Sequence, residues 1–177
     1  MRSMFALITA VLLVLHNPGL VVAQEASPAA SPAALSPPLA EWSAAVNSVD
    51  VDAVLDLFTA DGVWEEVAIG LVAQGPDEIG AHLDRLFTAV PDITFDVSSG
   101  FVAGERAVVE WTVSGTYSSD FPGLPPASGQ RFSFRGASIF QLEDGRIDHY
   151  TEYWDAYVFL VQLGALPAPE AAGTPTT

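Results

Sequence analysis

The end of the chain carries side chains that could move protons, at every second position of a predicted strand. Ile147, His149, Tyr153 and Asp155 fall on one face of that strand, because successive side chains of a strand point to opposite faces. A carboxyl group held out of water can take up and return a proton near neutral pH, and a neighbouring tyrosine can stabilise an enolate oxygen. The spacing is therefore compatible with cofactor-free acid/base chemistry, in which Asp155 would be the catalytic acid/base.

Asp155 also has a structural explanation. It directly precedes an apolar stretch predicted as a short helix, residues 156–163, and Gly164 follows that stretch. Asp is favoured at the N-cap of a helix, and Gly is favoured just past its C-terminus. A capping carboxylate accepts hydrogen bonds from backbone N–H groups, which lower its pKa. From the sequence, the helix cap and the acid/base role both remain open.

Aromatic and acidic side chains also alternate in two earlier predicted strands. Trp64 and Glu66 share one face of the first strand, and Trp111 and Tyr117 share one face of a later strand. Aromatic rows of this kind are most often core, but a pocket for a flat apolar ligand uses the same residue types. We expect these four residues to line a pocket for a small, largely apolar molecule, together with His149 and Tyr153.

The residue types exclude several other kinds of chemistry. Only His82 and His149 remain after the first 23 residues, they lie far apart, and the chain has no cysteine. Zinc-type sites need clustered His, Cys or acidic ligands at short spacings, and no glycine-rich phosphate loop or dinucleotide fingerprint is present. The sequence therefore predicts no metal site, no cofactor and no thiol chemistry.

The charge is strongly negative. Lys+Arg number 6 and Asp+Glu number 22, which gives a net charge of −16 at pH 7, and the chain contains no lysine. Such a surface repels phosphate backbones and anionic lipids. We therefore expect neither nucleic acid nor a membrane surface as a partner.

The first half of the domain has the apolar spacing of helices. Apolar residues at helical spacing run from Leu39 to Phe58 with a break near Ser48, and Asp61-Gly62 marks the end of this part. A strand is predicted over 63–70. A third helix is predicted after Gly75-Pro76, where acidic residues favour a helix N-terminus.

The second half has the alternation of strands. Strands are predicted over 93–104 and 106–117, followed by a hairpin over 131–155 that turns at Glu143-Asp144-Gly145. Helices followed by antiparallel strands indicate an α+β fold, with a curved antiparallel sheet packed on the N-terminal helices. A bent sheet under helices encloses a pocket between the layers.

Three stretches of this domain resemble a known family. They are GPDEIGAHLDRLFTAVPDITFDV (75–97), GTYSSDFPGLPPASGQRF (115–132) and RGASIFQLEDGRIDHYTEYWD (135–155), with QLG shortly after. They are similar to the SnoaL-like polyketide cyclases of the nuclear transport factor 2-like superfamily, over roughly Trp42 to Leu166. The resemblance implies a cone-shaped barrel of that superfamily.

The resemblance also implies roles for particular residues. In those cyclases an aspartate at the end of the last strand is the acid/base of an intramolecular aldol ring closure, and Asp155 matches it by position. Two pocket positions depart from the pattern, because Tyr117 stands where many members have His and Gln141 stands where a basic residue is common. This fold hosts enzymes and pure binders. Two functions therefore stay open, a cyclase or isomerase and a non-catalytic binding module, and the sheet could also support a homodimer.

The N-terminus has the pattern of a secretory signal. Arg2 precedes an apolar run from Met4 to Leu15, and Val21-Val22-Ala23 offers a cleavage site. The run is shorter than the roughly 20 residues that a membrane span needs, so we expect no stable membrane anchor. We therefore predict a signal peptide over 1–23, an Ala/Ser/Pro tether over 24–38, a SnoaL-like domain over 39–166, a tail over 167–177, and a secreted protein.

Overall fold

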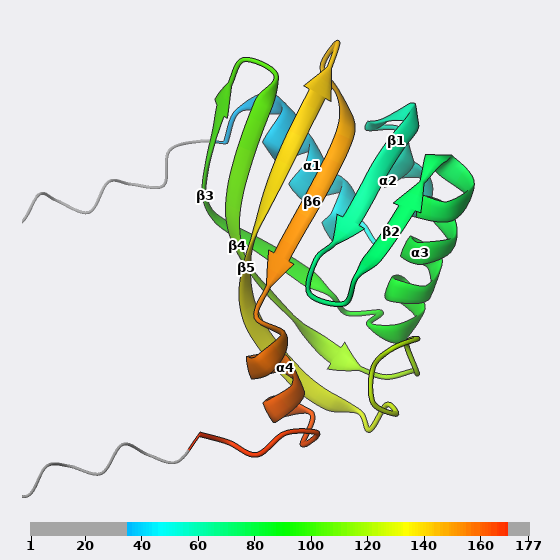
Figure 1. The fold of residues 1–177 in the computed structure, drawn as a ribbon, viewed down its shortest axis with the longest axis vertical. Helices are drawn as coiled ribbons and strands as arrows, with labels where there is room; N and C mark the ends of the chain where they lie inside the picture. The colour runs from blue at the N-terminus through cyan, green and yellow to red at the C-terminus, as the bar shows by residue number, and fades with distance from the viewer. Residues whose placement is uncertain (1–34, 170–177) are drawn as a thin grey trace, which may run out of the picture. The chain divides into compact units, whose positions relative to one another are not determined.

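The computed structural model describes residues 35–169 of the chain (Figure 1). The predicted signal peptide and most of the predicted tether and tail lie outside the described residues. The domain begins slightly earlier than the sequence predicts, because Pro37 and Pro38, assigned to the tether, form the first turn of helix α1. Proline is favoured at that position, where its missing N–H would have no partner in the helix.

A six-stranded sheet forms the body of the fold, in the order β2-β1-β6-β5-β4-β3 (Figure 1). Its neighbours pair antiparallel except β1 and β6, which are parallel. The predicted α+β fold is therefore confirmed, with two corrections: the sheet is mixed and not wholly antiparallel, and it is not closed into a barrel, because β2 and β3 remain as edges. The strands are β1 Phe58–Glu66, β2 Leu71–Gln74, β3 Thr94–Ala103, β4 Arg106–Tyr117, β5 Gln130–Glu143 and β6 Arg146–Trp154.

Helices α1, α2 and α3 lie against one side of this sheet, and α4 follows the end of β6 (Figure 1). The layer between them is filled by large aromatic side chains that are almost wholly buried, among them Trp42, Trp64, Trp111, Phe140 and Tyr150. Burying apolar area of this kind is the main favourable term in folding. The helices are α1 Pro37–Asn47, α2 Val51–Leu55, α3 Gly75–Ala89 and α4 Ala156–Gln162.

Polar side chains fix where the helices begin and how they attach. The Asp50 carboxylate accepts hydrogen bonds from the first backbone N–H groups of α2, and Asp77 and Glu78 stand in the first turn of α3, where the helix dipole favours negative charge. At the end of α1, the Asn47 amide exchanges hydrogen bonds of 2.9 and 2.7 Å with the backbone of Phe95 in β3. These contacts hold the helices over the sheet.

The first strand begins earlier than predicted. Phe58, at helical spacing from Val54, is the first residue of β1, and its backbone pairs with Ile147 of β6. The strand β2 was not predicted at all. β1 begins early because it pairs with the distant strand β6, whereas β2 forms by pairing with β1, which directly precedes it in the sequence. The predicted hairpin is confirmed, because Asp144 and Gly145 both have positive φ, 49° and 82°, between β5 and β6, as a two-residue type I′ turn requires.

Within residues 35–169, no helix is long and apolar enough to cross a membrane.

Gly136 of β5 should be intolerant of a side chain. A Cβ there would lie 2.7 Å from the Tyr153 carbonyl oxygen and closer still to the Trp111 ring, which is buried. We expect Gly136→Ala to lower the free energy of unfolding by about 1–3 kcal/mol through overpacking, as measured by urea denaturation. Gly80→Ala is the matched control, since its Cβ would meet the nearest atom at 3.4 Å. Equal stabilities for the two variants would contradict this account.

Candidate active site

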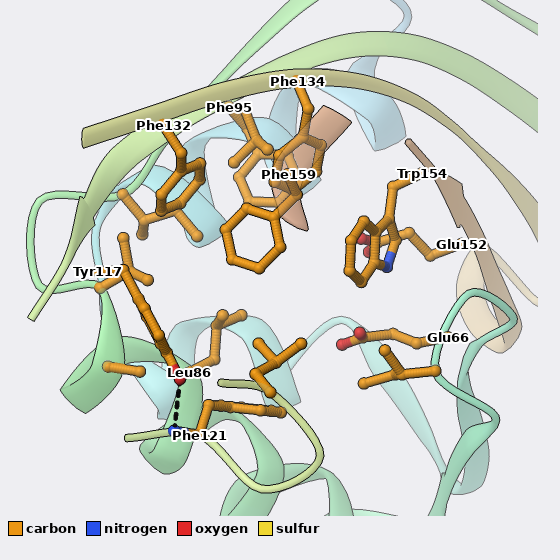
Figure 2. A pocket seen from close by; sticks show the side chains of 16 residues that line it. Glu66, Leu86, Phe95, Tyr117, Phe121, Phe132, Phe134, Glu152, Trp154 and Phe159 are labelled. Atoms are coloured by element: carbon orange, nitrogen blue, oxygen red, sulfur yellow. Dashed lines mark hydrogen bonds between the residues drawn. The ribbon is translucent and has the colours of Figure 1, made fainter. Parts of the chain in front are cut away.

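A cavity of about 70 Å³ lies between the concave side of the sheet, α3, α4 and the loop 118–129. Figure 2 shows its walls. Of the sixteen residues that line it, two are acidic, Glu66 and Glu152, and none is basic. The remaining walls are apolar and largely aromatic, with rings contributed by Phe95, Tyr117, Phe121, Phe132, Phe134, Trp154 and Phe159. The pocket therefore suits a small apolar molecule and presents it with two carboxyl groups.

The parallel pairing of β1 with β6 places the two acids together. Glu66 stands opposite Glu152 in the register of these strands, and Trp64 stands opposite Tyr150. Residues that stand directly opposite each other on neighbouring strands project from the same face of the sheet. Because neighbouring strands lie about 4.8 Å apart, the two acidic side chains start close together. Both carboxyl side chains are removed from bulk solvent, with Glu66 7% and Glu152 6% exposed.

Glu152 is a weak acid in this environment. Burial, and next the negative charge of Glu66, raise its pKa from the usual 4.5 to about 8, against the opposing effect of a hydrogen bond from Tyr150. A carboxyl group with this pKa is mostly protonated at neutral pH. Glu152 is therefore a group that can donate a proton inside the pocket.

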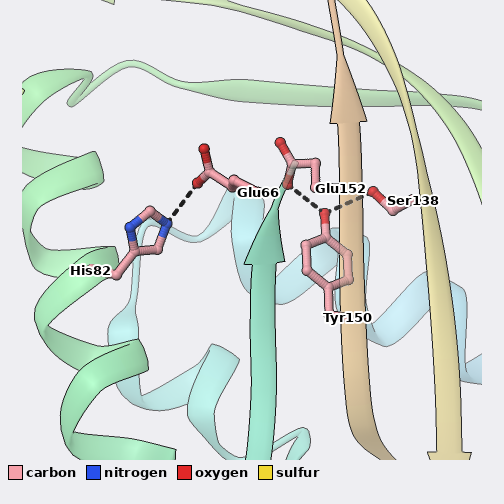
Figure 3. A network of polar contacts seen from close by, with 5 residues as sticks. All are labelled: Glu66, His82, Ser138, Tyr150 and Glu152. Carbon is pink, nitrogen blue, oxygen red and sulfur yellow. Dashed lines mark hydrogen bonds and ion pairs between the residues drawn. The ribbon is translucent and has the colours of Figure 1, made fainter. Parts of the chain in front are cut away.

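His82 stands behind Glu66 on helix α3. Its Nε2 lies 2.8 Å from the Glu66 Oε1, which makes an ion pair whenever the ring carries its second proton (Figure 3). The ring N–H is not well aligned with that oxygen, so the contact is electrostatic and not a well-formed hydrogen bond, and Nδ1 has no partner within residues 35–169. The ring is fully buried between Trp64 and Phe121. Glu66 thus has a basic neighbour, whereas Glu152 has none among its hydrogen-bond partners.

A chain of buried hydrogen bonds holds Glu152 from the other side (Figure 3). The Trp111 Nε1–H donates to the Ser138 hydroxyl over 2.8 Å, the Ser138 and Tyr150 hydroxyls are 2.8 Å apart, and Tyr150 donates to the Glu152 Oε2 over 2.7 Å. An indole N–H can only donate, so the Ser138 proton points to Tyr150 and the Tyr150 proton to Glu152. Burial raises the pKa of Tyr150 well above 10, so this donor keeps its proton. One Glu152 oxygen is thereby occupied, and the other is left for a ligand.

Comparison with known families identifies the family of this domain. The family model described as "SnoaL-like domain" matches residues 39–150. The chain belongs to the SnoaL-like domain family. The resemblance stated from the sequence motifs is therefore confirmed. None of the curated proteins compared with the chain matches it.

Solved structures share the architecture of this SnoaL-like domain. A predicted polyketide cyclase from Pseudomonas putida is 25% identical, with a TM-score of 0.64 over 71% of this chain and 94% of that one. TsrD from Streptomyces laurentii is 28% identical, with a TM-score of 0.63 over 73% of this chain and 93% of that one. A protein of ketosteroid isomerase-like fold from Catenulispora acidiphila, solved in complex with trimethylamine, is 21% identical. Its TM-score is 0.63 over 72% of this chain and 92% of that one. The last likeness shows the fold alone.

Four of the residues predicted for the pocket point to the interior of the SnoaL-like domain. Glu66 and Tyr117 line the cavity, while Trp64 and Trp111 are buried in the core. The Tyr117 hydroxyl is engaged by the loop 118–129, because it donates to the Pro125 carbonyl and accepts from the Phe121 N–H, each over 2.9 Å. This hydroxyl therefore holds the loop over the cavity, and no free donor for an enolate oxygen remains there.

The face of β6 that the sequence predicted to line the pocket lies on the outer side of the sheet. His149 lies on the outer side of the sheet, 3.2 Å from the Glu65 Oε2, and Tyr153 is 48% exposed. The cause is a bulge: Gln141 pairs with His149 but Leu142 pairs with Ile147, so Asp148 is an extra residue. One extra residue inverts the alternation. Ile147 is therefore buried without bringing the rest of its predicted face inward.

The residues that do face the pocket from β6 were missed. The inner face after the bulge carries Tyr150, Glu152 and Trp154, of which Glu152 and Trp154 line the cavity. Gln141, predicted as a pocket residue from the family pattern, is exposed near the far end of β5. The signal available in the sequence was that two aromatic residues flank Glu152 at alternate positions, which makes that face the more apolar one.

Asp155 is placed as a helix cap. Its Oδ1 accepts the Val158 N–H of helix α4 over 2.9 Å, its side chain is exposed, and it does not line the cavity. Of the two roles that the sequence left open, its position favours the cap.

Replacing Asp155 should affect stability and little else. We expect Asp155→Ala to lower the free energy of unfolding by about 1 kcal/mol, the usual effect of losing an N-cap, and Asp155→Asn to preserve most of it. Thermal denaturation of the three proteins measures this order. If Asp155→Asn unfolded as readily as Asp155→Ala, the carboxylate would have a role other than accepting the Val158 N–H.

Proposed function

We propose that this SnoaL-like domain binds a small, largely apolar molecule in its pocket and catalyses a cofactor-free acid/base reaction on it, of the aldol-cyclisation or isomerisation type. The observation that carries the proposal is the pairing of Glu66 with Glu152 at the one acidic end of an apolar cavity. A pair of carboxyl groups in different environments is the usual means of running acid and base steps together at neutral pH. The likeness to a predicted polyketide cyclase adds support.

The two acids would divide the proton transfers. The Glu66 carboxylate removes a proton from the carbon next to a substrate carbonyl, and protonated Glu152 gives its proton to the carbonyl oxygen, which leaves a neutral enol. For an isomerisation, Glu66 returns its proton to another carbon of the enol while Glu152 takes the hydroxyl proton back. For a ring closure, the enol carbon attacks a second carbonyl and a carbon–carbon bond forms. The new alkoxide oxygen takes the proton held by Glu66, and Glu152 takes back the enol hydroxyl proton as the first carbonyl re-forms.

The surroundings suit these steps. The aromatic walls exclude water, which keeps the pKa of Glu152 close to the working pH of a general acid. Tyr150 orients Glu152 by occupying one of its oxygens. His82 beside Glu66 compensates the charge of the base when its ring is protonated.

A non-catalytic binding module of the same fold is the second candidate. The observation in its favour is that Asp155, the positional match to the catalytic aspartate of the cyclases, lies outside the cavity. A binder would need the apolar walls but no proton transfer.

Two measurements separate the candidates. The first is a carboxyl-carbon NMR titration, with Glu152→Gln to assign the signal. The second is the exchange of the α-protons of cyclohexanone in D₂O, followed by proton NMR. An acid/base enzyme should show a Glu152 pKa near 8 and exchange faster than in buffer. A Glu152 pKa below about 5, near the reference value of a free carboxyl, with exchange no faster than in buffer, would make the binding module the better description.

Export of the protein is a separate proposal. It is supported by the apolar run from Met4 to Leu15 and the small residues at Val21-Val22-Ala23. Mass spectrometry of the protein recovered outside the producing cells should find Gln24 as its first residue. Recovery only inside the cells, with Met1 retained, would contradict it.

A further inference from the structure

We propose that the natural ligand of this pocket carries a protonated amine, seated between the two carboxyl groups and the ring of Trp154. The inference deepens the proposed function and rests on it for the place where the ligand binds. It follows from two features of the cavity: a pair of acidic residues with no basic residue among the lining residues, and the aromatic walls beside them.

The charge of the pocket is not balanced from within. Glu66 has His82 behind it, but Glu152 faces Glu66 and is held only by the neutral donor Tyr150. The chain has no lysine, and none of the arginines in residues 35–169 lines the cavity. A buried carboxylate without a positive partner is costly. Glu152 therefore keeps its proton, and a cation that would favour its ionised form has to come with the ligand.

The walls next to the acids suit an organic cation. Trp154 follows Glu152 by two positions on the same face of β6 and lines the same cavity (Figure 2). Its ring stacks on Phe134 at 5.1 Å between centroids and meets Phe159 edge-on at 5.7 Å, so it is held in place from two sides. The face of a tryptophan ring is the most favourable aromatic surface for an ammonium group. Carboxylates and a fixed aromatic ring together recognise alkylammonium ions.

Binding of such a cation would lower the pKa of Glu152 and make its proton easier to transfer. A positive charge beside a carboxyl group favours its ionised form. The groups that face Glu152 are Glu66 from β1 and Tyr150 from β6, with His82 of α3 behind Glu66 and the engaged Tyr117 hydroxyl on β4. Since none of these places a permanent positive charge beside Glu152, the ligand's ammonium group would be the first cation to contact this carboxyl group.

The test compares three ligands of the same size and different charge: benzylammonium, benzyl alcohol and benzoate. We expect calorimetry at pH 7 to show benzylammonium binding at least about tenfold more tightly than benzyl alcohol, a difference of about 1.4 kcal/mol, and benzoate not binding. Glu152→Gln should reduce the preference to less than about threefold. Glu65→Gln is the matched control, because Glu65 is the neighbouring acid on the outer face, and it should keep the preference.

The outcomes separate this inference from the proposed function. Equal or tighter binding of benzyl alcohol overturns the amine inference, while a Glu152 pKa near 8 and exchange of cyclohexanone protons would still support the acid/base function. A tenfold preference with no exchange would support the amine and leave the domain a binder. Failure of all three ligands to bind at millimolar concentration would overturn the inference as well.

Discussion

Glu152→Gln should make the domain more stable than the wild type above pH 8, by several kcal/mol. The pKa of Glu152 is raised from the usual 4.5 to about 8 in the folded protein, so the folded state holds this proton more tightly than the unfolded state. The stability it contributes is fully present below about pH 4.5 and is lost as the pH rises to 8. Each pH unit in this window costs about 1.4 kcal/mol, so the whole loss approaches about 5 kcal/mol. Glutamine cannot ionise and escapes this loss.

Urea denaturation of both proteins at pH 5 and pH 9 measures the effect. Other titrating groups are common to both proteins, so the difference between their free energies of unfolding isolates Glu152. Glutamine keeps a carbonyl oxygen to accept the Tyr150 proton, and the variant should stay folded. Glu65→Gln, on the outer face, should follow the pH dependence of the wild type. If the free energies of unfolding of Glu152→Gln and the wild type changed equally with pH, Glu152 would be ionised at neutral pH. It could then not be the proton donor.

Loss of either carboxyl group should abolish most of the proposed catalysis. General acid/base groups typically contribute about 10²–10⁴-fold to a rate, so we expect Glu66→Gln and Glu152→Gln each to slow the exchange of cyclohexanone α-protons by a factor in this range. Because the two acids act in one step, the double variant should be no slower than the worse single variant. The rates are measured by proton NMR in D₂O.

Asp155→Asn serves as the control for this series. It lies outside the cavity, so its exchange rate should equal that of the wild type. If Asp155→Asn lost the activity while Glu66→Gln kept it, the reaction would take place at the end of β6 and not in the cavity.

Local chemistry made much of the fold predictable. The turn at Glu143-Asp144-Gly145, the start of α3 after Gly75 and the short helix after Asp155 depend on residues close in sequence, and the structure has each of them. The early start of β1 and the whole of β2 were not predictable in this way. Pairing with β6, which is distant in sequence, fixes where β1 starts, and pairing with β1 forms β2.

The site was predictable only in part, for one local reason. Glu66 and the aromatic rows of β1 and β4 follow simple alternation, and they point inward as expected. In β6 the bulge at Asp148 inverts the alternation, so the face chosen from Ile147 was the outer one. Glu152 was missed for this reason, because no residue near Asp148 predicts a bulge from the sequence.

The pairing of β1 with β6 has a consequence for how the domain folds. Strands β1 and β6, the first and last in chain order, must meet before Glu66 and Glu152 face each other. The site therefore forms only when two segments far apart in the sequence come together. Contacts between distant segments form slowly, and the chain gains nothing from them until closure. The titration of Glu152 is therefore also a reporter of complete folding. An intermediate that has its helices and the β3–β4–β5 meander, but not the last strand, would show an ordinary carboxyl in its place.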